Sequence, residues 1–353
     1  MMPYLRLVFL AALFPAALAM AQTTRYAWTN SPDPRVPFTN WTTAAHILQD
    51  AVDVSADGDT IIVTNGVYDV GGRPAPTPSS ALTNRVMITN AITVRSIAGP
   101  KETIIRGQGP IGLSAVRGAY LTNGAVLSGF RLENGQTTSD FDLGATLDKQ
   151  GGGILSFENC TVTNCLIVSN AASQSGGGIR GQATTVANCD LNQNDSEDGG
   201  GAYLLGGTLR GCSFFDNVAS PGYGGGARVF DGIVSGCTFV SNNGYWGGGL
   251  MLEGGSASDV VAVSNMAAAG AGIAAAEAVI SQVRLAHNTA YDRGGGAYLE
   301  MCWLTDSIVS NNDLAWQELT NQPAYGAGIA STVSRIENCV LADNRGFDAD
   351  DRG

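Results

Sequence analysis

The feature that most restricts the fold of this 353-residue chain is a glycine repeat with a nearly constant period. Gly-Gly-Gly or Gly-Ala-Gly triplets recur at intervals of 23 to 25 residues, and the last interval is 32 residues. The triplets begin at Gly151, Gly176, Gly199, Gly224, Gly247, Gly270, Gly294 and Gly326. A constant period of this length is typical of a solenoid, in which each repeat forms one coil that stacks on the next.

Two further positions are constant within each repeat. An asparagine stands 18 residues after the start of each triplet, or 19 in the first repeat, and we expect these residues to form an internal amide ladder at a turn, in the left-handed conformation. The ladder is Asn170, Asn194, Asn217, Asn242, Asn265, Asn288, Asn312 and Asn344. A small residue, usually Cys or Val, stands 13 residues after the same point, or 14 in the first repeat, and is expected to face the core. Glycines are expected where φ is positive or where adjacent coils touch.

Short alternating runs of apolar residues separate these markers, as in Leu204, Leu209, Cys212 and Phe214. Such runs predict short β-strands joined by tight turns. We therefore predict an all-β chain that forms a single-stranded right-handed parallel β-helix with three short strands per coil. A leucine-rich repeat fits less well, because the Leu-x-x-Leu-x-Leu pattern and a helical half-repeat are absent from the sequence.

The segments outside the regular repeats suggest the domain boundaries. Residues 1–21 hold one arginine, an apolar run and Ala-Met-Ala, which predicts a signal peptide and a location outside the cell or on the outer membrane. Residues 22–40 form an extended segment, and 41–54 predict an amphipathic helix that caps the β-helix, with Thr42 or Thr43 at its start. The β-helix spans 41–353, with early coils over 60–150, a projecting loop at 135–150 and eight regular coils over 151–353. The chain ends on the Asp-Arg-Gly that also opens the repeat at Gly294, so we expect a truncated C-terminus.

Charge and cysteine content narrow the range of partners and bonds. The net charge is −12, which excludes nucleic acid as a favoured partner because a phosphate backbone attracts basic surfaces. The seven cysteines leave two arrangements open. One is a disulfide between stacked coils, Cys189 with Cys212 or Cys212 with Cys237, and the other is a column of buried thiols.

Two stretches resemble known families. The repeats "GGGAYL", "GGGARV" and "GGGAYLE", with "FFDN" at 214–217 and "FVSN" at 239–242, resemble those of chlamydial polymorphic outer membrane proteins. Residues 41–72 resemble the entry segment of secreted pectin-lyase-like β-helix proteins. The resemblance implies a right-handed parallel β-helix, with adhesion or polysaccharide contact outside the cell.

One face of the predicted solenoid gathers aromatic, arginine and carboxylate side chains. Residues four and six positions after each triplet start are expected to point outward from one sheet, and further aromatics stand just before the triplets. Sugar rings stack on aromatic faces and hydrogen-bond to arginine and carboxylates. The sequence therefore predicts a glycan-binding ridge formed by Arg180, Tyr203, Tyr223, Arg228, Trp246, Tyr291 and Tyr298.

Three functions fit this sequence. The first is a noncatalytic, adhesin-like or glycan-binding module that needs no cofactor and takes an extracellular glycan as its partner. The second is a polysaccharide lyase or glycoside hydrolase, in which Arg228 with Asp198 and Glu253 would react and Ca²⁺ would bind only if the protein is a lyase. The third is a structural stalk. The motifs Gly-His-Gly and Arg-Ile-Lys are absent, and His46 and His287 are expected at surface or turn positions.

Overall fold

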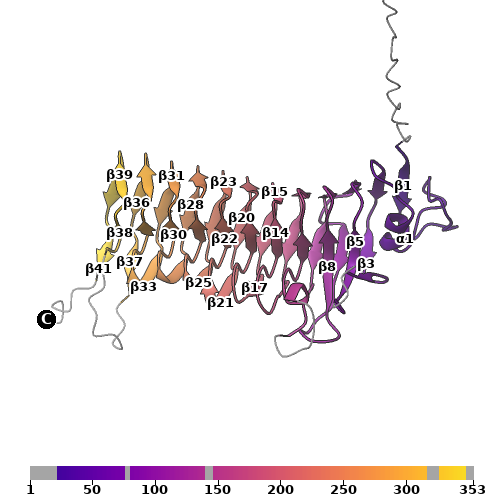
Figure 1. The fold of residues 1–353 in the computed structure, drawn as a ribbon, viewed down its shortest axis with the longest axis horizontal. Coiled ribbons are helices and arrows are strands. Elements are labelled where there is room, and N and C mark those ends of the chain that lie inside the picture. The colour runs from indigo at the N-terminus through magenta and orange to yellow at the C-terminus, as the bar shows by residue number, and fades with distance from the viewer. Residues whose placement is uncertain (1–21, 76–79, 140–145, 316–325, 347–353) are drawn as a thin grey trace, which may run out of the picture.

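The computed structural model describes residues 22–75, 80–139, 146–315 and 326–346. The chain winds into an elongated stack of coils, with β1 and α1 at one end and β38 to β41 at the other (Figure 1). Its strands form four sheets of 12, 11, 11 and 7 strands, which we name A, B, C and D. Neighbouring strands come from successive coils and pair in parallel, except that β4 and β5 pair antiparallel.

Sheets A and B run along the whole stack. Sheet A contains β1 (Thr24–Ala27), β2 (Thr60–Val63), β6 (Thr93–Ser96), β9 (Val126–Ser128), β12 (Thr161–Thr163), β15 (Thr185–Ala187), β19 (Thr208–Arg210), β23 (Ile233–Ser235), β27 (Ser256–Ser258), β31 (Val279–Ser281), β35 (Trp303–Thr305) and β39 (Arg335–Glu337). Sheet B contains β3 (Gly66–Tyr68), β7 (Thr103–Arg106), β10 (Arg131–Glu133), β13 (Leu166–Val168), β16 (Asp190–Asn192), β20 (Ser213–Phe215), β24 (Thr238–Val240), β28 (Val261–Val263), β32 (Arg284–Ala286), β36 (Ile308–Ser310) and β40 (Val340–Ala342).

Sheets C and D follow each glycine triplet and each ladder asparagine, respectively. Sheet C contains β4 (Arg73–Pro74), β5 (Thr83–Ile88), β8 (Val116–Leu121), β11 (Ile154–Ser156), β14 (Ile179–Gln182), β18 (Ala202–Leu205), β22 (Ala227–Phe230), β26 (Leu250–Glu253), β30 (Ile273–Ala276), β34 (Ala297–Glu300) and β38 (Ile329–Thr332). Sheet D contains β17 (Asp195–Ser196), β21 (Val218–Tyr223), β25 (Asn243–Trp246), β29 (Met266–Ala269), β33 (Thr289–Arg293), β37 (Asp313–Leu314) and β41 (Arg345–Gly346).

The fold is a right-handed parallel β-helix, the hand that crossovers between parallel strands almost always take. Sheets A, B and C supply the three strands per coil that the sequence predicts. Sheet D adds a fourth strand to the later coils, in the segment between the asparagine and the next triplet. Strands β21, β25, β29 and β33 of this sheet each end directly before the triplet that leads into sheet C.

Glycine makes each coil possible at the corner between sheets D and C. Gly224 has a φ of +66°, which favours glycine, and a Cβ on Gly225 would lie 2.3 Å from the carbonyl oxygen of Asn243 in the next coil. Every coil needs a positive φ and a close backbone approach at this corner, so the glycine triplet recurs in every coil. This corner confirms the expected role of the glycines.

The asparagine ladder is present along the whole regular stack. Each Nδ2 donates to the Oδ1 of the next asparagine at 2.9–3.0 Å, and the same Oδ1 accepts the preceding coil's backbone N–H. One part of the prediction is wrong: the ladder residues themselves do not have positive φ. The residue before each takes the left-handed conformation, as at Asp216 and Ser241, which turns the asparagine side chain into the interior.

The interior between the sheets is a continuous apolar core. The Phe214 and Phe239 rings stack within it at 4.6 Å. The seven cysteines are free thiols, six of them buried, so the structure has the thiol column and not the disulfides. Burial raises the pKa of the Cys160 and Cys302 thiols, which keeps both protonated.

The N-terminal end differs from the sequence prediction in its helix. The only α-helix in the described part of the chain is α1 (Leu48–Asp53), shorter than the predicted 41–54. Its N-cap residue is Ile47, not Thr42 or Thr43, and makes no side-chain capping hydrogen bond. Residues before it are held by β1 instead, because Ala45 exchanges backbone hydrogen bonds with Tyr26 and Trp28. β1 lies within residues 22–40 and is already the first strand of sheet A. The predicted signal peptide lies outside the described residues.

Candidate functional site: an aromatic face along sheets C and D

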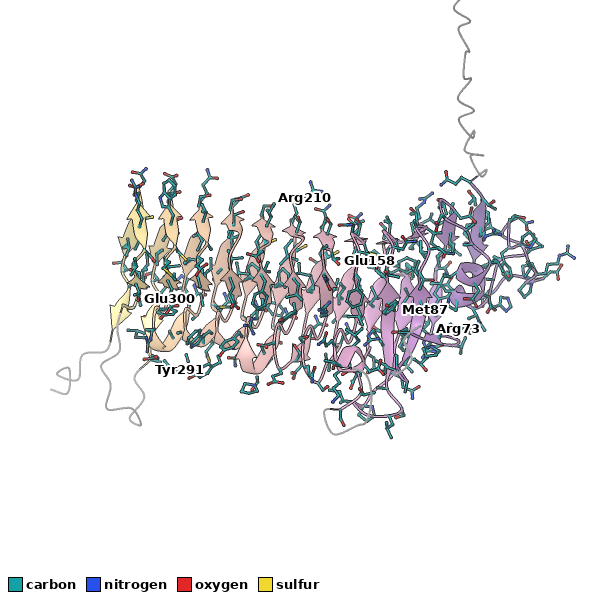
Figure 2. All side chains as sticks on the ribbon, viewed as in Figure 1. Arg73, Met87, Glu158, Arg210, Tyr291 and Glu300 are labelled. Atoms are coloured by element: carbon teal, nitrogen blue, oxygen red, sulfur yellow. The ribbon has the colours of Figure 1, made fainter. Side chains whose placement is uncertain are left out.

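Sheet C aligns its outward side chains in columns, as the sequence predicts. Strand register places Arg180 beside Tyr203, Tyr203 beside Arg228 and Arg228 beside Met251. The same column runs back to Met87 in β5 and on to Tyr298 in β34. Figure 2 shows Met87 towards the N-terminal end and Glu300, two residues after Tyr298, towards the opposite end. One face therefore carries side chains from many coils in a line.

Sheet D supplies a second column next to the first. Tyr223 pairs with Trp246, Trp246 with Ala269, and Ala269 with Arg293, and each of these residues directly precedes a glycine triplet. The sharp turn at the triplet brings this column against the outward side chains of sheet C. Two aromatic columns that are separate in the sequence thus become one surface.

Ring contacts run along sheet D and join it to sheet C at Trp246. Tyr223 lies 5.5 Å from Trp246 and Trp246 lies 5.8 Å from Tyr298, between ring centroids. Tyr245 stacks on Trp246 at 6.4 Å with an interplanar angle of 10°, and it is 54% exposed. We define the aromatic ridge as Tyr203, Tyr223, Arg228, Phe230, Tyr245, Trp246 and Tyr298.

Arg228 holds the centre of the aromatic ridge. Its guanidinium lies 4.6 Å from the Tyr223 ring centroid and 4.7 Å from that of Phe230. It donates to Asp198 Oδ2 at 2.9 Å and to Glu253 Oε1 at 2.8 Å, so it joins three coils. Burial acts to lower the pKa of Arg228, but the two carboxylates outweigh it and raise the pKa above its ordinary value. Arg228 is therefore suited to binding and positioning and not to proton abstraction.

Arg180 is the second arginine of the column and has no such partners. Only 8% of the residue is exposed, and Nε and Nη1 are buried without any hydrogen-bond acceptor among the described residues. Its guanidinium lies 5.1 Å from the Phe157 ring centroid. Burial lowers the pKa of Arg180 below its ordinary value. These two nitrogens are donors that the described residues leave unsatisfied beneath this face.

The structure does not bring every predicted residue into the ridge. Tyr291 lies in β33 and its hydroxyl contacts Met266 Sδ at 2.7 Å, so it stands on sheet D apart from the ridge contacts. In Figure 2, Tyr291 lies at the opposite edge of the molecule from Arg210 of sheet A. The predicted trio of Arg228, Asp198 and Glu253 is in contact, although both carboxylates are already bound to the arginine.

Sequence reasoning left several contributors out of the ligand-binding set. Phe230 and Tyr245 complete the ridge, and Arg293 lies over the Tyr298 ring at 5.5 Å. Tyr120 extends the sheet C column and contacts Phe157 at 6.0 Å. A signal for Tyr120 was available, because "GAYL" at 118–121 repeats "GAYL" at 201–204.

Two further tests concern metals and membranes. Within the residues that the structure describes, no three His, Cys, Asp or Glu side chains gather closely enough to hold a metal ion. In the same residues, no helix has the length and apolar character needed to cross a membrane. The Ca²⁺ site stays a prediction tied to the lyase alternative.

Together, the sheets and the ridge define a class: a parallel β-helix protein with a cluster of aromatic side chains on one side. The sequence matches no protein-family model and no curated protein. Among solved structures, the chain is similar to pectate lyase Pel9A, with 11% identity, a TM-score of 0.46, and coverage of 89% of this chain and 79% of that one. It is also similar to the A-module of mannuronan C-5 epimerase AlgE4 from Azotobacter vinelandii, with 12% identity, a TM-score of 0.39, and coverage of 85% and 91%.

A third similar structure is the Dettilon tailspike protein, with 11% identity and a TM-score of 0.49. The match covers 90% of this chain and 62% of that one. The assignment of the fold rests on the strand register of this chain and on no one of these similarities.

Proposed function

We propose that this chain is a noncatalytic glycan-binding protein that acts outside the cell, in the manner of an adhesin, and that the aromatic ridge is its binding surface. The observation that supports the proposal is the contact series from Tyr203 through Arg228 and Trp246 to Tyr298. Coils repeat about every 4.8 Å, so the series offers ring faces and polar groups along an extended line. Such a line suits an extended chain of sugar residues more than a compact ligand.

The polar groups of the ridge add hydrogen-bonding capacity to the ring faces. Asp198 and Glu253 are about one quarter to one third exposed beside Arg228, and Asp198 Oδ1 also accepts the Tyr223 N–H at 2.8 Å. Arg180 adds a second guanidinium, whose Nε and Nη1 have no hydrogen-bond acceptor among the described residues. Ring faces flanked by fixed acids and arginines match the hydroxyl-rich edges and apolar faces of sugars.

The test is affinity electrophoresis through native gels that each contain one polysaccharide. The panel holds polygalacturonate, alginate, chondroitin sulfate, xyloglucan, galactomannan and mixed-linkage β-glucan. We expect at least one polymer to retard the protein. Trp246→Ala is expected to weaken binding to that polymer by about tenfold, which corresponds to about 1.4 kcal/mol.

A matched control separates the ridge from aromatic surface in general. Trp303 is 45% exposed on sheet A, away from the ridge, and Trp303→Ala should leave retardation unchanged. No retardation by any polymer, or an equal loss in both variants, would count against the glycan-binding proposal and favour a structural stalk.

The lyase alternative is favoured by one observation, the contact of Arg228 with Asp198 and Glu253. It predicts that a uronate polymer incubated with the protein and Ca²⁺ gains the ultraviolet absorbance of an unsaturated sugar. Arg228→Lys would then abolish the absorbance while the circular dichroism spectrum stays the same. We expect no gain, because the salt bridges hold both carboxylates away from an acid–base role.

A further inference from the structure

The aromatic face of sheet C is bounded at its N-terminal end by a packed segment of the chain. There, residues 80–82 and the turn η1 (Thr146–Lys149) stand against β5, β8 and β11. Tyr120 and Leu155 belong to the same column as Arg180 and Arg228, yet they are only 7% and 0% exposed because Ala75 and Leu147 pack on them. This packed segment forms a wall across the end of the face.

The wall is firmly attached to the coils beneath it. The Asp148 carboxylate accepts hydrogen bonds from Ser80 Oγ at 2.6 Å and from the Ala81 N–H at 2.8 Å. Arg117, whose side chain is fully buried, donates to the carbonyl oxygens of Leu147 at 2.6 Å and Gln150 at 2.8 Å. A buried arginine bound to the backbone of the wall is a strong tie, because breaking it would leave a charge buried without partners.

A pocket of about 330 Å³ lies at the foot of the wall. Tyr120, Phe157 and Leu147 form its apolar side, and Thr122, Glu158 and Gln182 form its polar side. It joins the ridge through Phe157, whose ring contacts the Arg180 guanidinium, and through Gln182, which pairs with Leu205 in the next strand. The line of side chains that begins at Tyr298 therefore ends in this pocket.

We propose that the pocket binds the terminal sugar of the glycan chain, so that the protein recognises chain ends and not chain interiors. The inference rests on the proposed glycan-binding function. A chain that lies along the ridge meets the wall after Arg180, and a pocket of this size is at the lower limit of small-molecule sites and holds little more than one ring. Phe157, which rests against the covered Tyr120 ring at 6.0 Å between centroids, offers a ring face to that sugar, and Glu158 and Gln182 offer acceptors and donors to its free hydroxyls.

Binding stoichiometry distinguishes the two modes of binding. The polymer that retards the protein in electrophoresis is cut into fractions of defined mean length. Each fraction is then titrated into the wild-type protein by calorimetry. Recognition of ends gives a constant number of bound proteins per glycan chain, whatever the length. Binding along chain interiors gives a number that rises in proportion to length, and that result would overturn the inference while leaving the glycan-binding proposal in place.

A pair of variants locates the end within the pocket. Gln182 is exposed at the pocket and Thr332 is exposed at the far end of the same outward column, so Gln182→Trp and Thr332→Trp are matched. We expect Gln182→Trp to weaken binding by tenfold or more and Thr332→Trp to have no effect. Equal binding by both variants would place the chain end elsewhere. If no polymer is retarded at all, the glycan-binding proposal and this inference fail together.

Discussion

At the scale of single residues, a buried asparagine stabilises this fold because the fold stacks many copies of it in a column. One buried asparagine costs stability unless its amide is fully hydrogen-bonded. In this chain each ladder asparagine between the two ends of the ladder meets its own kind above and below, so its amide is bonded by the next copy. Repetition therefore makes buried asparagine compatible with an otherwise apolar core.

Removal of a central ladder residue should be costly. Asn242 is fully buried, donates to Phe214 O and Asn265 Oδ1, and accepts two N–H groups from Asn217. We expect Asn242→Ala to lower the free energy of unfolding by about 2–4 kcal/mol, because these groups lose their partners in the interior. Asn344→Ala, at the end of the ladder, should cost clearly less in urea denaturation, since Asn344 is partly exposed. Equal costs would mean that the ladder itself is not the source of stability.

For Arg180 we expect that replacement raises stability and weakens glycan binding. Its buried guanidinium has neither a carboxylate nor an acceptor for Nε and Nη1 among the described residues. Replacement by an apolar side chain of similar length removes that cost, so we expect Arg180→Met to raise the free energy of unfolding by about 1 kcal/mol. The same variant should bind the retarding polysaccharide several-fold less tightly. A destabilised Arg180→Met protein would contradict the view that this arginine is kept for binding.

At the scale of elements, the sequence repeat predicts the strands that occur in every coil and misses the strands whose sequences differ from coil to coil. Sheets A, B and C could be predicted because their strands lie at constant distances from the triplets. Sheet D could not, since its strands are as different as "VASPGY" at 218–223 and "MAAA" at 266–269 and share only their place in the coil. The place of Tyr223 and Trp246 beside the sheet C column could still be predicted, because both stand directly before a triplet. Helix α1 is shorter than its apolar pattern predicts, because pairing with β1 takes the backbone of Ala45.

Strand β1 depends on one carboxylate and should therefore be sensitive to acid. Asp59 accepts hydrogen bonds from the N–H groups of Thr23 and Ala56 and pairs with Arg25 at 3.1 Å. Burial acts to raise the pKa of Asp59, but these bonds and the arginine outweigh it and lower the pKa below its ordinary value. A lowered folded-state pKa means that the stabilisation is present above the unfolded pKa of about 4 and is lost as the pH falls below it.

Hydrogen exchange measures this effect directly. The amides of β1 should lose protection as the pH falls from about 4 towards 2, once the intrinsic exchange rate is corrected for pH. Asp59→Asn should show the reduced protection already at neutral pH. Asp33→Asn is the control, because Asp33 pairs with Arg35 on the exposed surface. If the amides of β1 are equally protected in the two variants, Asp59 does not have the proposed role.

At the scale of the whole molecule, each coil is stable mainly because of its two neighbours. A solenoid of this kind behaves as a one-dimensional array, in which the contact between adjacent coils sets how cooperatively the stack unfolds. The ridge inherits this property, since Tyr203, Arg228 and Tyr298 lie on different coils and are aligned only while the coils stay in register. Binding along the ridge should accordingly depend on every contact between those coils.

Gly225→Ala tests this dependence at the middle of the ridge. A Cβ at Gly225 would meet backbone atoms of Asn243 at 2.3 and 2.5 Å and Gly248 O at 2.6 Å, and backbone cannot move aside as a side chain can. We expect the free energy of unfolding to fall by about 3 kcal/mol or more and the urea transition to split in two. In hydrogen exchange, the amides of the coils before β22 and of the coils after β25 should lose protection independently. Glycan binding should weaken together with stability, because Arg228 and Trp246 would no longer be aligned.

Gly206→Asn is the control: Gly206 has positive φ but open space around its Cβ position, and asparagine tolerates that conformation. A single cooperative transition in Gly225→Ala would show that the stack does not divide at this contact.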